Sequence, residues 1–374
     1  MGERAQGRRA GAAPQQVVAH APGRANILGE HTDHQRGLVM PFALARGVTV
    51  TGVRTAGRTA GRTAERTAGR TAERTAERTA EVLALDVAAE DRFALDAIPG
   101  AAAGDWRAHV RGTLAEMERA AGPLPGMRLT VTADLPMGAG LSSSAALGSA
   151  VALAALALAG APEMERFLLA AVLRRVEWEW AGVRTGLMDQ LAVLVAREGH
   201  ALLADMATLD TRDVPIGAAR FAGRDAGRRS VADGRYRERV DECAEAARLL
   251  GLPDLHGVEA DAAAALPPAL AARVRHVASE NARARAGADA LRRGDLRTLG
   301  ALLDASHRSL RDDFAVSTPA VEEAWEAAHR DGALGARIMG AGFGGTVIAL
   351  WDGPPPDGWT PLDPGRPAWA QVVR

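Results

Sequence analysis

The sequence contains no lysine, and all 45 of its basic residues are arginine. This absence excludes a lysine-dependent P-loop, a protein-kinase-type ATP site and a Schiff-base enzyme. The single cysteine, Cys243, can form neither an internal disulfide nor a cysteine zinc site. A chain of this kind suits the reducing cytoplasm, where we expect the protein to work.

Long apolar runs and a charge of one sign are also missing. The most apolar stretch, residues 145–161, is rich in alanine and would barely cross a bilayer, so we expect a buried helix rather than a membrane span. Residues 1–13 lack the apolar segment of a secretory signal. The net charge of -1, without a basic DNA-reading helix or a zinc motif, gives no reason to expect a nucleic-acid partner. No obligate protein partner is inferred.

The chain of 374 residues, 47% of them hydrophobic, is long enough for two domains. Strand-like and helix-like segments alternate without a regular βαβ rhythm, which favours an α+β fold. We expect a flexible N-terminus over 1–15, an N-terminal domain over 16–200 and a C-terminal domain over 201–374. Residues 54–81 repeat Arg-Thr-Ala-Gly or Arg-Thr-Ala-Glu seven times. This repeat has no apolar face to bury, and we interpret it as a low-complexity insertion in a surface loop.

A glycine- and serine-rich turn at residues 135–146 separates a predicted strand (128–133) from the alanine-rich helix. Gly138 and Gly140 would let a ligand approach the backbone. Three consecutive serines would stand at the N-terminus of the helix, where free amides and the helix dipole favour an anion such as phosphate. A serine-capped helix after a glycine turn is the structural alternative.

Residues 21–37 are predicted to form a loop broken by glycine and proline. Within ten residues this segment carries Arg24, Asn26, Glu30, His31 and Asp33. Such a density of hydrogen-bonding side chains suits a polyhydroxylated ligand, because each hydroxyl needs a partner once it leaves water. A metal site at these residues is less favoured, since no second histidine pair has a usable spacing.

Two further segments carry chemistry. Asp189, in Gly186-Leu-Met-Asp-Gln190, follows a glycine and two apolar residues, so its carboxylate could serve as a base, as an orienting group or simply as a helix cap. The cluster Gly340-Ala-Gly-Phe-Gly-Gly345 precedes a predicted strand instead of following one, which excludes a dinucleotide fingerprint.

Taken in order from Val17 to Ala349, the four segments resemble the GHMP family of small-molecule kinases, and most closely its members that act on galactose. The resemblance implies a two-domain α+β kinase with its site in the cleft between the domains. It also implies transfer of the γ-phosphate of ATP, with Mg²⁺, to the anomeric hydroxyl of galactose, the first committed step of galactose catabolism.

The same resemblance assigns roles. Asp189 would take or orient the hydroxyl proton, and Arg24 would keep Asp189 ionised and stabilise the transferring charge. The sugar would be lined by Glu30, His31, Asp33, Gly186 and Tyr236. ATP would be bound by Trp106, Gly138, Gly140, Leu141, Ser142, Ser143, Ser144 and Ala145. Ser144 and Glu177 would bind Mg²⁺.

Some positions depart from the family pattern. His34 stands where tyrosine is usual, and Arg184 where proline is common before the Gly186 motif. Residues 214–230 replace an apolar strand by a segment with Arg220, Gly223 and Arg224, which predicts a badly weakened central strand. Two alternatives therefore stay open: a GHMP kinase for another sugar, such as an N-acetylhexosamine or arabinose, and a non-catalytic sensor of galactose and ATP. Intact Arg24, Asp189 and 142–145 argue against the sensor.

Overall fold

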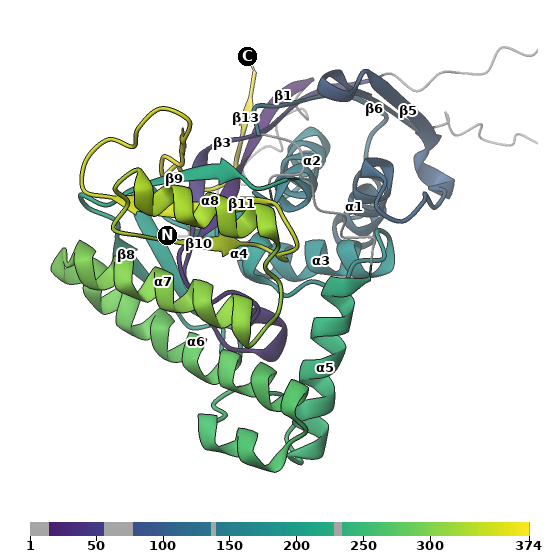
Figure 1. The fold of residues 1–374 in the computed structure, drawn as a ribbon. Helices are drawn as coiled ribbons and strands as arrows, with labels where there is room; N and C mark the ends of the chain where they lie inside the picture. Colours follow the sequence, from purple (N-terminus) through teal and green to yellow (C-terminus); the bar gives the residue numbers. More distant parts are fainter. Residues whose placement is uncertain (1–14, 56–77, 136–139, 228–233, 374) are drawn as a thin grey trace, which may run out of the picture.

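The computed structural model describes residues 15–55, 78–135, 140–227 and 234–373 (Figure 1). The strands are β1 (Gln16–Asn26), β2 (Leu38–Val39), β3 (Pro41–Arg54), β4 (Thr79–Ala84), β5 (Ala89–Ala94), β6 (Met127–Ala133), β7 (His200–Asp205), β8 (Thr211–Pro215), β9 (Arg220–Asp225), β10 (Gly335–Met339), β11 (Thr346–Trp351), β12 (Thr360–Pro361) and β13 (Trp369–Val372). The α-helices are α1 (Trp106–Ala121), α2 (Ser143–Ala159), α3 (Arg166–Glu179), α4 (Met188–Val195), α5 (Arg235–Leu249), α6 (Pro268–Arg293), α7 (Leu296–Asp312) and α8 (Pro319–Arg330). Short 3-10 helices are η1 (Asp33–Gln35), η2 (Leu85–Val87), η3 (Leu95–Ala97) and η5 (Ala260–Ala265).

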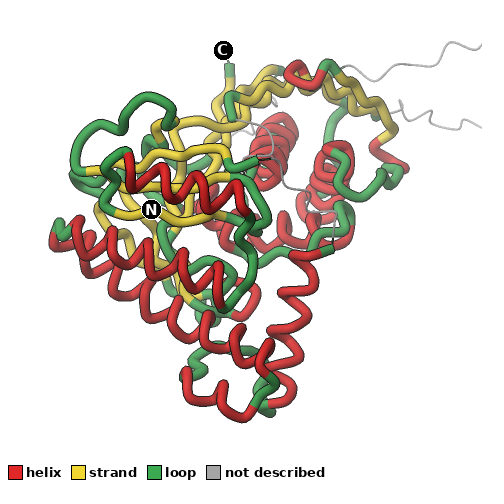
Figure 2. The backbone as a smooth tube through the Cα atoms, in the orientation of Figure 1, coloured by secondary structure: helices red, strands yellow, loops and turns green. Residues whose placement is uncertain are grey.

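A six-stranded sheet with the order β13-β1-β3-β6-β4-β5 forms one part of the molecule. Its only parallel pair is β4 with β6, and all its other neighbours are antiparallel. Helix α2 packs against β1 and β3, and α1 packs against α2 (Figure 1). Because α2 is almost entirely alanine, leucine and valine, it can be buried on most sides, and it ends at Gly160 in the left-handed conformation. The expected α+β class is confirmed: the strands run from the middle of the molecule to its upper right edge, with helices below and beside them (Figure 2).

A second sheet, with the order β10-β11-β9-β12, is covered by α7 and α8. The third sheet, β2-β7-β8, contacts the long helix α6. Two of these elements matter for the site: β10 leads into the glycine cluster at 340–345, and α6 runs beside the segment between β1 and β2.

Strand β9 corrects the expectation of a disrupted segment at 214–230. The strand forms and pairs with β11 over six residues, and its other neighbour is only the two-residue β12. Arg220 is exposed at one end of β9, and Arg224 stacks 5.7 Å from the ring centroid of Trp359. Gly223 faces the methyl group of Thr346, which would lie 2.7 Å from an added Cβ. The arginines are tolerated because they leave the sheet core, and the glycine makes room for a neighbouring side chain.

Two boundaries also differ from expectation. Strand β1 extends to Asn26 with a register shift between Pro22 and Arg24, so Arg24 and Asn26 lie on a strand rather than a loop. The repeat at 54–81 does not lie wholly in a loop, because Arg54 ends β3 and residues 79–81 begin β4. Its middle, 56–77, lies outside the described residues, as does nearly all of the predicted flexible N-terminus over 1–15.

The last strand, β13, returns to pair with β1, so the end of the chain joins the first sheet. The proposed division at 200/201 remains a prediction. Within the described ranges, every helix is too short or too polar to traverse a lipid bilayer.

Candidate active site

A pocket of about 400 Å³ lies where β1, the N-terminus of α2, α3, α4, α5 and the glycine cluster meet. This volume falls in the usual range for a small-molecule site. Its lining consists of Arg24, Glu30, His31, Asp33, Gly104, His109, Gly140, Ser142, Ser143, Ser144, Glu177, Val183, Thr185, Met188, Asp189, Tyr236, Gly340 and Ala341. Residues more than 200 positions apart in the sequence are thus brought to one cavity.

Arg24 and Asp189, which both line this pocket, form an ion pair. Arg24 Nε donates to Asp189 Oδ1 at 2.7 Å, and Arg24 Nη1 donates to the carbonyl of Gly140 at 2.6 Å. The Arg24 side chain is 4% exposed and that of Asp189 19%. The guanidinium therefore orients the carboxylate and fastens the glycine-rich turn beside it, while Asp189 still reaches the cavity.

The N-terminus of α2 presents an anion-binding surface. Ser142, the residue before the helix, has a left-handed backbone (φ 59°, ψ 44°), and its Oγ is buried without a hydrogen-bond partner among the described residues. Ser143 and Ser144 line the pocket next to it. The first backbone amides of a helix have no intrahelical acceptor, and its dipole favours negative charge. A buried hydroxyl that lacks a partner at this position suits a phosphate oxygen.

Glu177 on α3 contacts this helix terminus. It accepts a hydrogen bond from Ser144 Oγ at 3.0 Å on one oxygen and from Thr185 Oγ1 on the other. Burial, together with the charge of Asp189, raises the pKa of Glu177 to about 7. No ion pair between Glu177 and a basic side chain occurs in the part of the chain that the structure describes. A buried carboxylate beside a hydroxyl, without a compensating cation, fits a hard divalent cation with oxygen ligands. No cluster of three or more histidine, cysteine, aspartate or glutamate side chains suited to a metal occurs over the described ranges, so further ligands would have to come from substrate or water.

Another wall of the pocket is formed by Glu30, His31, Asp33 and Tyr236. The His31 ring lies 4.5 Å from that of Phe314 and 5.8 Å from that of Tyr236. Burial and the charges of Asp189 and Glu30 raise the pKa of Asp33 to about 7. Burial also raises the pKa of Tyr236 well above its ordinary value, so the phenol stays protonated and can donate. This wall combines donors, acceptors and ring faces, as a sugar requires.

Some predicted site residues do not line the pocket. Gly186 packs against Asp33: a Cβ at Gly186 would overlap with the Asp33 carboxylate. The glycine therefore leaves room for the side chain of Asp33. Leu141 and Ala145 are buried on either side of the serines, and Leu141 accepts a backbone hydrogen bond from Arg24 at 3.0 Å. Trp106 packs against the core instead of the cavity. Gly138 lies outside the described residues.

Several residues at or next to the pocket were not among the predicted site residues, and three of them carry polar side chains. His109 and Thr185 line it. Arg337, on β10, is fully buried and pairs with Glu30 Oε2 at 2.7 Å. A signal was available for Arg337, because a lone charge in a short apolar strand requires a buried partner. No comparable signal marked Thr185 beyond its position next to the Gly186 motif.

Family models match three parts of the chain. The galactokinase galactose-binding signature matches residues 8–54, the GHMP kinases N terminal domain matches 108–197, and the GHMP kinases C terminal model matches 288–357.

Similar sequences and structures agree with these matches. A galactokinase from Roseiflexus sp. (strain RS-1) is 37% identical over 89% of this chain and 83% of its own length. A galactokinase from Mycobacterium tuberculosis (strain H37Rv) is 38% identical over 88% of this chain and 87% of its own. The crystal structure of Lactococcus lactis galactokinase complexed with galactose superposes with a TM-score of 0.83, at 25% identity and 96% coverage of both chains. Methanococcus jannaschii mevalonate kinase shares the fold, with a TM-score of 0.65 at 17% identity and 91% coverage of both chains.

Proposed function

The chain belongs to the galactokinases of the GHMP kinase family, and from this premise we propose how its pocket phosphorylates galactose with ATP. The enzyme is a sugar kinase, a phosphotransferase with an alcohol group as acceptor. The observation that carries the mechanism is the Arg24–Asp189 pair. Arg24 also donates to the carbonyl of Gly140, two residues before Ser142, and the charge of Asp189 acts on Asp33.

In our proposal the phosphates of ATP bind at the N-terminus of α2. The backbone amides of the first turn and the Ser142 hydroxyl would donate to phosphate oxygens, which supplies the missing partner of Ser142 Oγ. Ser144 and Glu177 are the residues that would hold Mg²⁺. When bound, Mg²⁺ would neutralise charge on the β- and γ-phosphates. Glu177 would then be ionised, because a nearby cation favours the charged carboxylate.

The sugar would occupy the wall formed by Glu30, His31, Asp33 and Tyr236, with its anomeric hydroxyl toward Asp189. Asp189 would either accept the proton of that hydroxyl in the transition state or orient the hydroxyl for attack on the γ-phosphate. The attack yields galactose 1-phosphate and ADP. Arg24 fixes Asp189 Oδ1 and leaves Oδ2 for the substrate. The fixed positive charge of Arg24 also lies where negative charge moves during phosphoryl transfer.

We further propose that the enzyme works in the cytoplasm. Its one thiol, Cys243, is buried among the helices, where burial raises its pKa to about 12 and leaves the thiol unreactive. An enzyme of this kind needs no oxidising compartment.

The test is ADP release with Mg-ATP against galactose, glucose, N-acetylgalactosamine and arabinose, with phosphorus NMR of the product. We expect selective turnover of galactose and a phosphate on C1. Turnover of another sugar in preference to galactose would contradict the substrate assignment. A folded protein that binds ATP and galactose but releases no ADP would contradict catalysis and favour a sensor.

A further inference from the structure

Arg337 connects the second sheet to the segment that forms the sugar wall. It lies on β10, and its side chain is fully buried. Arg337 Nη2 donates to the carbonyl of Asn26 at 2.6 Å and to Glu30 Oε2 at 2.7 Å, and Arg337 Nε donates to the carbonyl of Ile27 at 2.8 Å. Arg337 Nη1 donates to the carbonyl of Ile338, the next residue in the chain, at 3.1 Å. Most donors of one guanidinium are thus directed at one short segment, 26–30.

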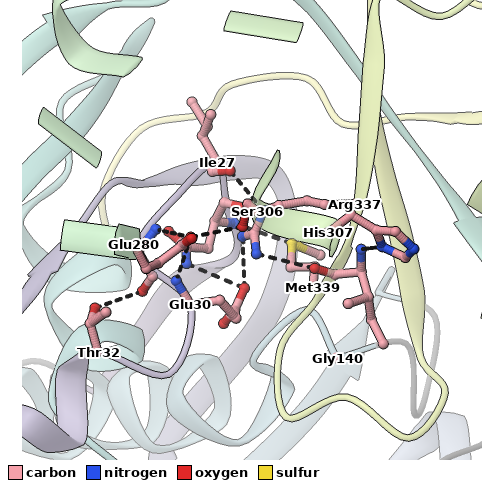
Figure 3. A network of polar contacts seen from close by, with 12 residues as sticks. Ile27, Glu30, Thr32, Gly140, Glu280, Ser306, His307, Arg337 and Met339 are labelled. Carbon is pink, nitrogen blue, oxygen red and sulfur yellow. Dashed lines mark hydrogen bonds and ion pairs between the residues drawn. The ribbon is translucent and has the colours of Figure 1, made fainter. Parts of the chain in front are cut away.

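Glu280 on α6 holds the backbone of the same segment from the other side. Its Oε1 accepts the amide protons of Gly29 at 2.9 Å and Glu30 at 3.3 Å, and the hydroxyl of Ser306 at 2.8 Å (Figure 3). Burial alone would raise the pKa of Glu280, but the nearby positive charges, Arg283 first, hold it at about 2. The carboxylate is therefore ionised at all ordinary pH values and remains an acceptor for both amides.

A third contact, from His276 on α6, fixes the carbonyl of Glu30 in the same segment. Burial lowers the pKa of His276 to about 4, so its ring is neutral, and His276 Nε2 lies 3.1 Å from the carbonyl of Glu30. Because a carbonyl can only accept, Nε2 carries the proton and donates it. The backbone then turns sharply, since the next residue, His31, has a positive φ of 59°. A non-glycine residue in this conformation persists when its surroundings determine the backbone.

The two oxygens of Glu30 have different surroundings. Oε2 accepts from Arg337 at 2.7 Å and from Asn26 Nδ2 at 3.3 Å. No hydrogen bond to Oε1 is found within the described ranges, and Glu30 lines the pocket. A carboxylate that is 2% exposed as a residue needs a paired charge, and Arg337 is its ion-pair partner in this structure.

We propose that Arg337, with Glu280, is a positioning residue for sugar recognition and acts through Glu30. Arg337 takes Oε2, which turns Oε1 toward the cavity as the acceptor for a hydroxyl of the sugar, while Glu280 fixes the backbone that carries Glu30. Neither residue touches the substrate. The inference rests on the proposed function, because it takes the occupant of this wall to be galactose.

A purely structural role for Arg337 would weaken folding without a specific effect on galactose. A double-mutant cycle separates the two roles, because residues that act through one another have non-additive effects. The variants are Arg337→Lys, Glu30→Gln and the pair, with galactose affinity measured by calorimetry and both KM values by kinetics. Lysine keeps the charge but cannot reproduce the planar fork that contacts three carbonyls and a carboxylate.

Arg111→Lys is the matched control. Arg111 on α1 also holds a carboxylate, that of Asp91 at 2.7 and 2.8 Å, and a carbonyl, that of Gly100 at 2.7 Å, but it has no contact with 26–30. It tests what the loss of such a fork does to the fold alone.

We expect Arg337→Lys to weaken galactose binding about tenfold, as the loss of a well-oriented charged hydrogen bond would. The KM for ATP should stay within about twofold, and the effect on galactose should shrink to about twofold or less in the Glu30→Gln background. Arg111→Lys should leave both KM values unchanged. Additive effects of Arg337→Lys and Glu30→Gln, or equal changes in the two KM values, would overturn the proposal.

If Arg337→Lys does not fold, the same cycle with Glu280→Gln decides, with the same non-additivity expected and additivity again contradicting the proposal. Turnover of galactose by the unchanged protein is measured first. Its absence would overturn the proposed function and this inference together, whereas turnover with an additive cycle would overturn only the role of Arg337 and Glu280.

Discussion

The ionised carboxylate of Asp33 is expected to lower the free energy of unfolding, although the proposed function needs it to bind the sugar. Burial and the charges of Asp189 and Glu30 raise its pKa from 3.8 to about 7. Between these two values the folded protein retains a proton that the unfolded chain has lost, so the free energy of unfolding falls as the pH rises. Above about pH 7 the carboxylate is ionised in both states and the full cost remains.

The perturbation is Asp33→Asn, which keeps the shape and one acceptor oxygen but cannot ionise. A shift of this size corresponds to at most about 4 kcal/mol. Because Asp33 lines the pocket, water can screen part of this energy, so the expected gain is below that limit, at about 2–3 kcal/mol. The variant should therefore unfold at higher urea than the unchanged protein at about pH 8, and at nearly the same urea at about pH 4.

The assay is urea unfolding without ligand at several pH values, together with the thermal shift on adding galactose. Galactose should raise the melting temperature of the unchanged protein but not of Asp33→Asn, because the sugar wall loses a charged acceptor. Asp295→Asn is the control: Asp295 caps α7 through Thr298, hydrogen bonds from Thr298 lower its pKa, and asparagine also caps well, so no gain at about pH 8 is expected. A difference between Asp33→Asn and the unchanged protein that does not vary with pH, or a variant less stable at about pH 8, would refute this reasoning.

Two other substitutions test the phosphate site and the second sheet. Ser142→Ala should raise the KM for ATP about tenfold with little loss of stability, because the buried hydroxyl has no partner in the described structure. Ser149→Ala is the control: its hydroxyl, on α2, is also buried without a partner there, and the KM for ATP should stay unchanged. Equal effects of both variants would remove Ser142 from the ATP site. Gly223→Val should destabilise the fold by about 1–3 kcal/mol, because its Cβ would meet Thr346 at 2.7 Å, and urea unfolding that matches the unchanged protein would show that β9 accommodates a side chain there.

Local patterns predicted much of the fold and the site. Strand β6 and helix α2 follow from residues adjacent in sequence. Of the glycine–serine turn between them, residues 136–139 lie outside the described part of the chain. Strand β9 could not be predicted in the same way. The cost of Arg224 and Gly223 depends on Trp359 and Thr346, which lie more than 100 residues away and take up the charge and the space.

The contacts of Arg337 and Glu280 with Glu30 could not be predicted from the sequence for the same reason. Glu30 meets Arg337 and Glu280 across about 300 and 250 residues. Nothing in a short motif indicates that a strand before the glycine cluster and a helix in the second half of the chain will hold it. Arg24 was placed correctly in its motif but on the wrong element, because a register shift after Pro22 lets β1 continue to Asn26.

The most direct test of the account is the rate of galactose 1-phosphate formation by Asp189→Asn, with galactose and ATP binding measured on the same sample. The substitution keeps the size of the side chain but removes the proton acceptor and the ion pair with Arg24 at 2.7 Å. We expect kcat to fall at least about a hundredfold while both ligands still bind, since general-base catalysis typically contributes factors of this order. An undiminished kcat would contradict the assignment of Asp189, and with it the mechanism built on the Arg24–Asp189 pair.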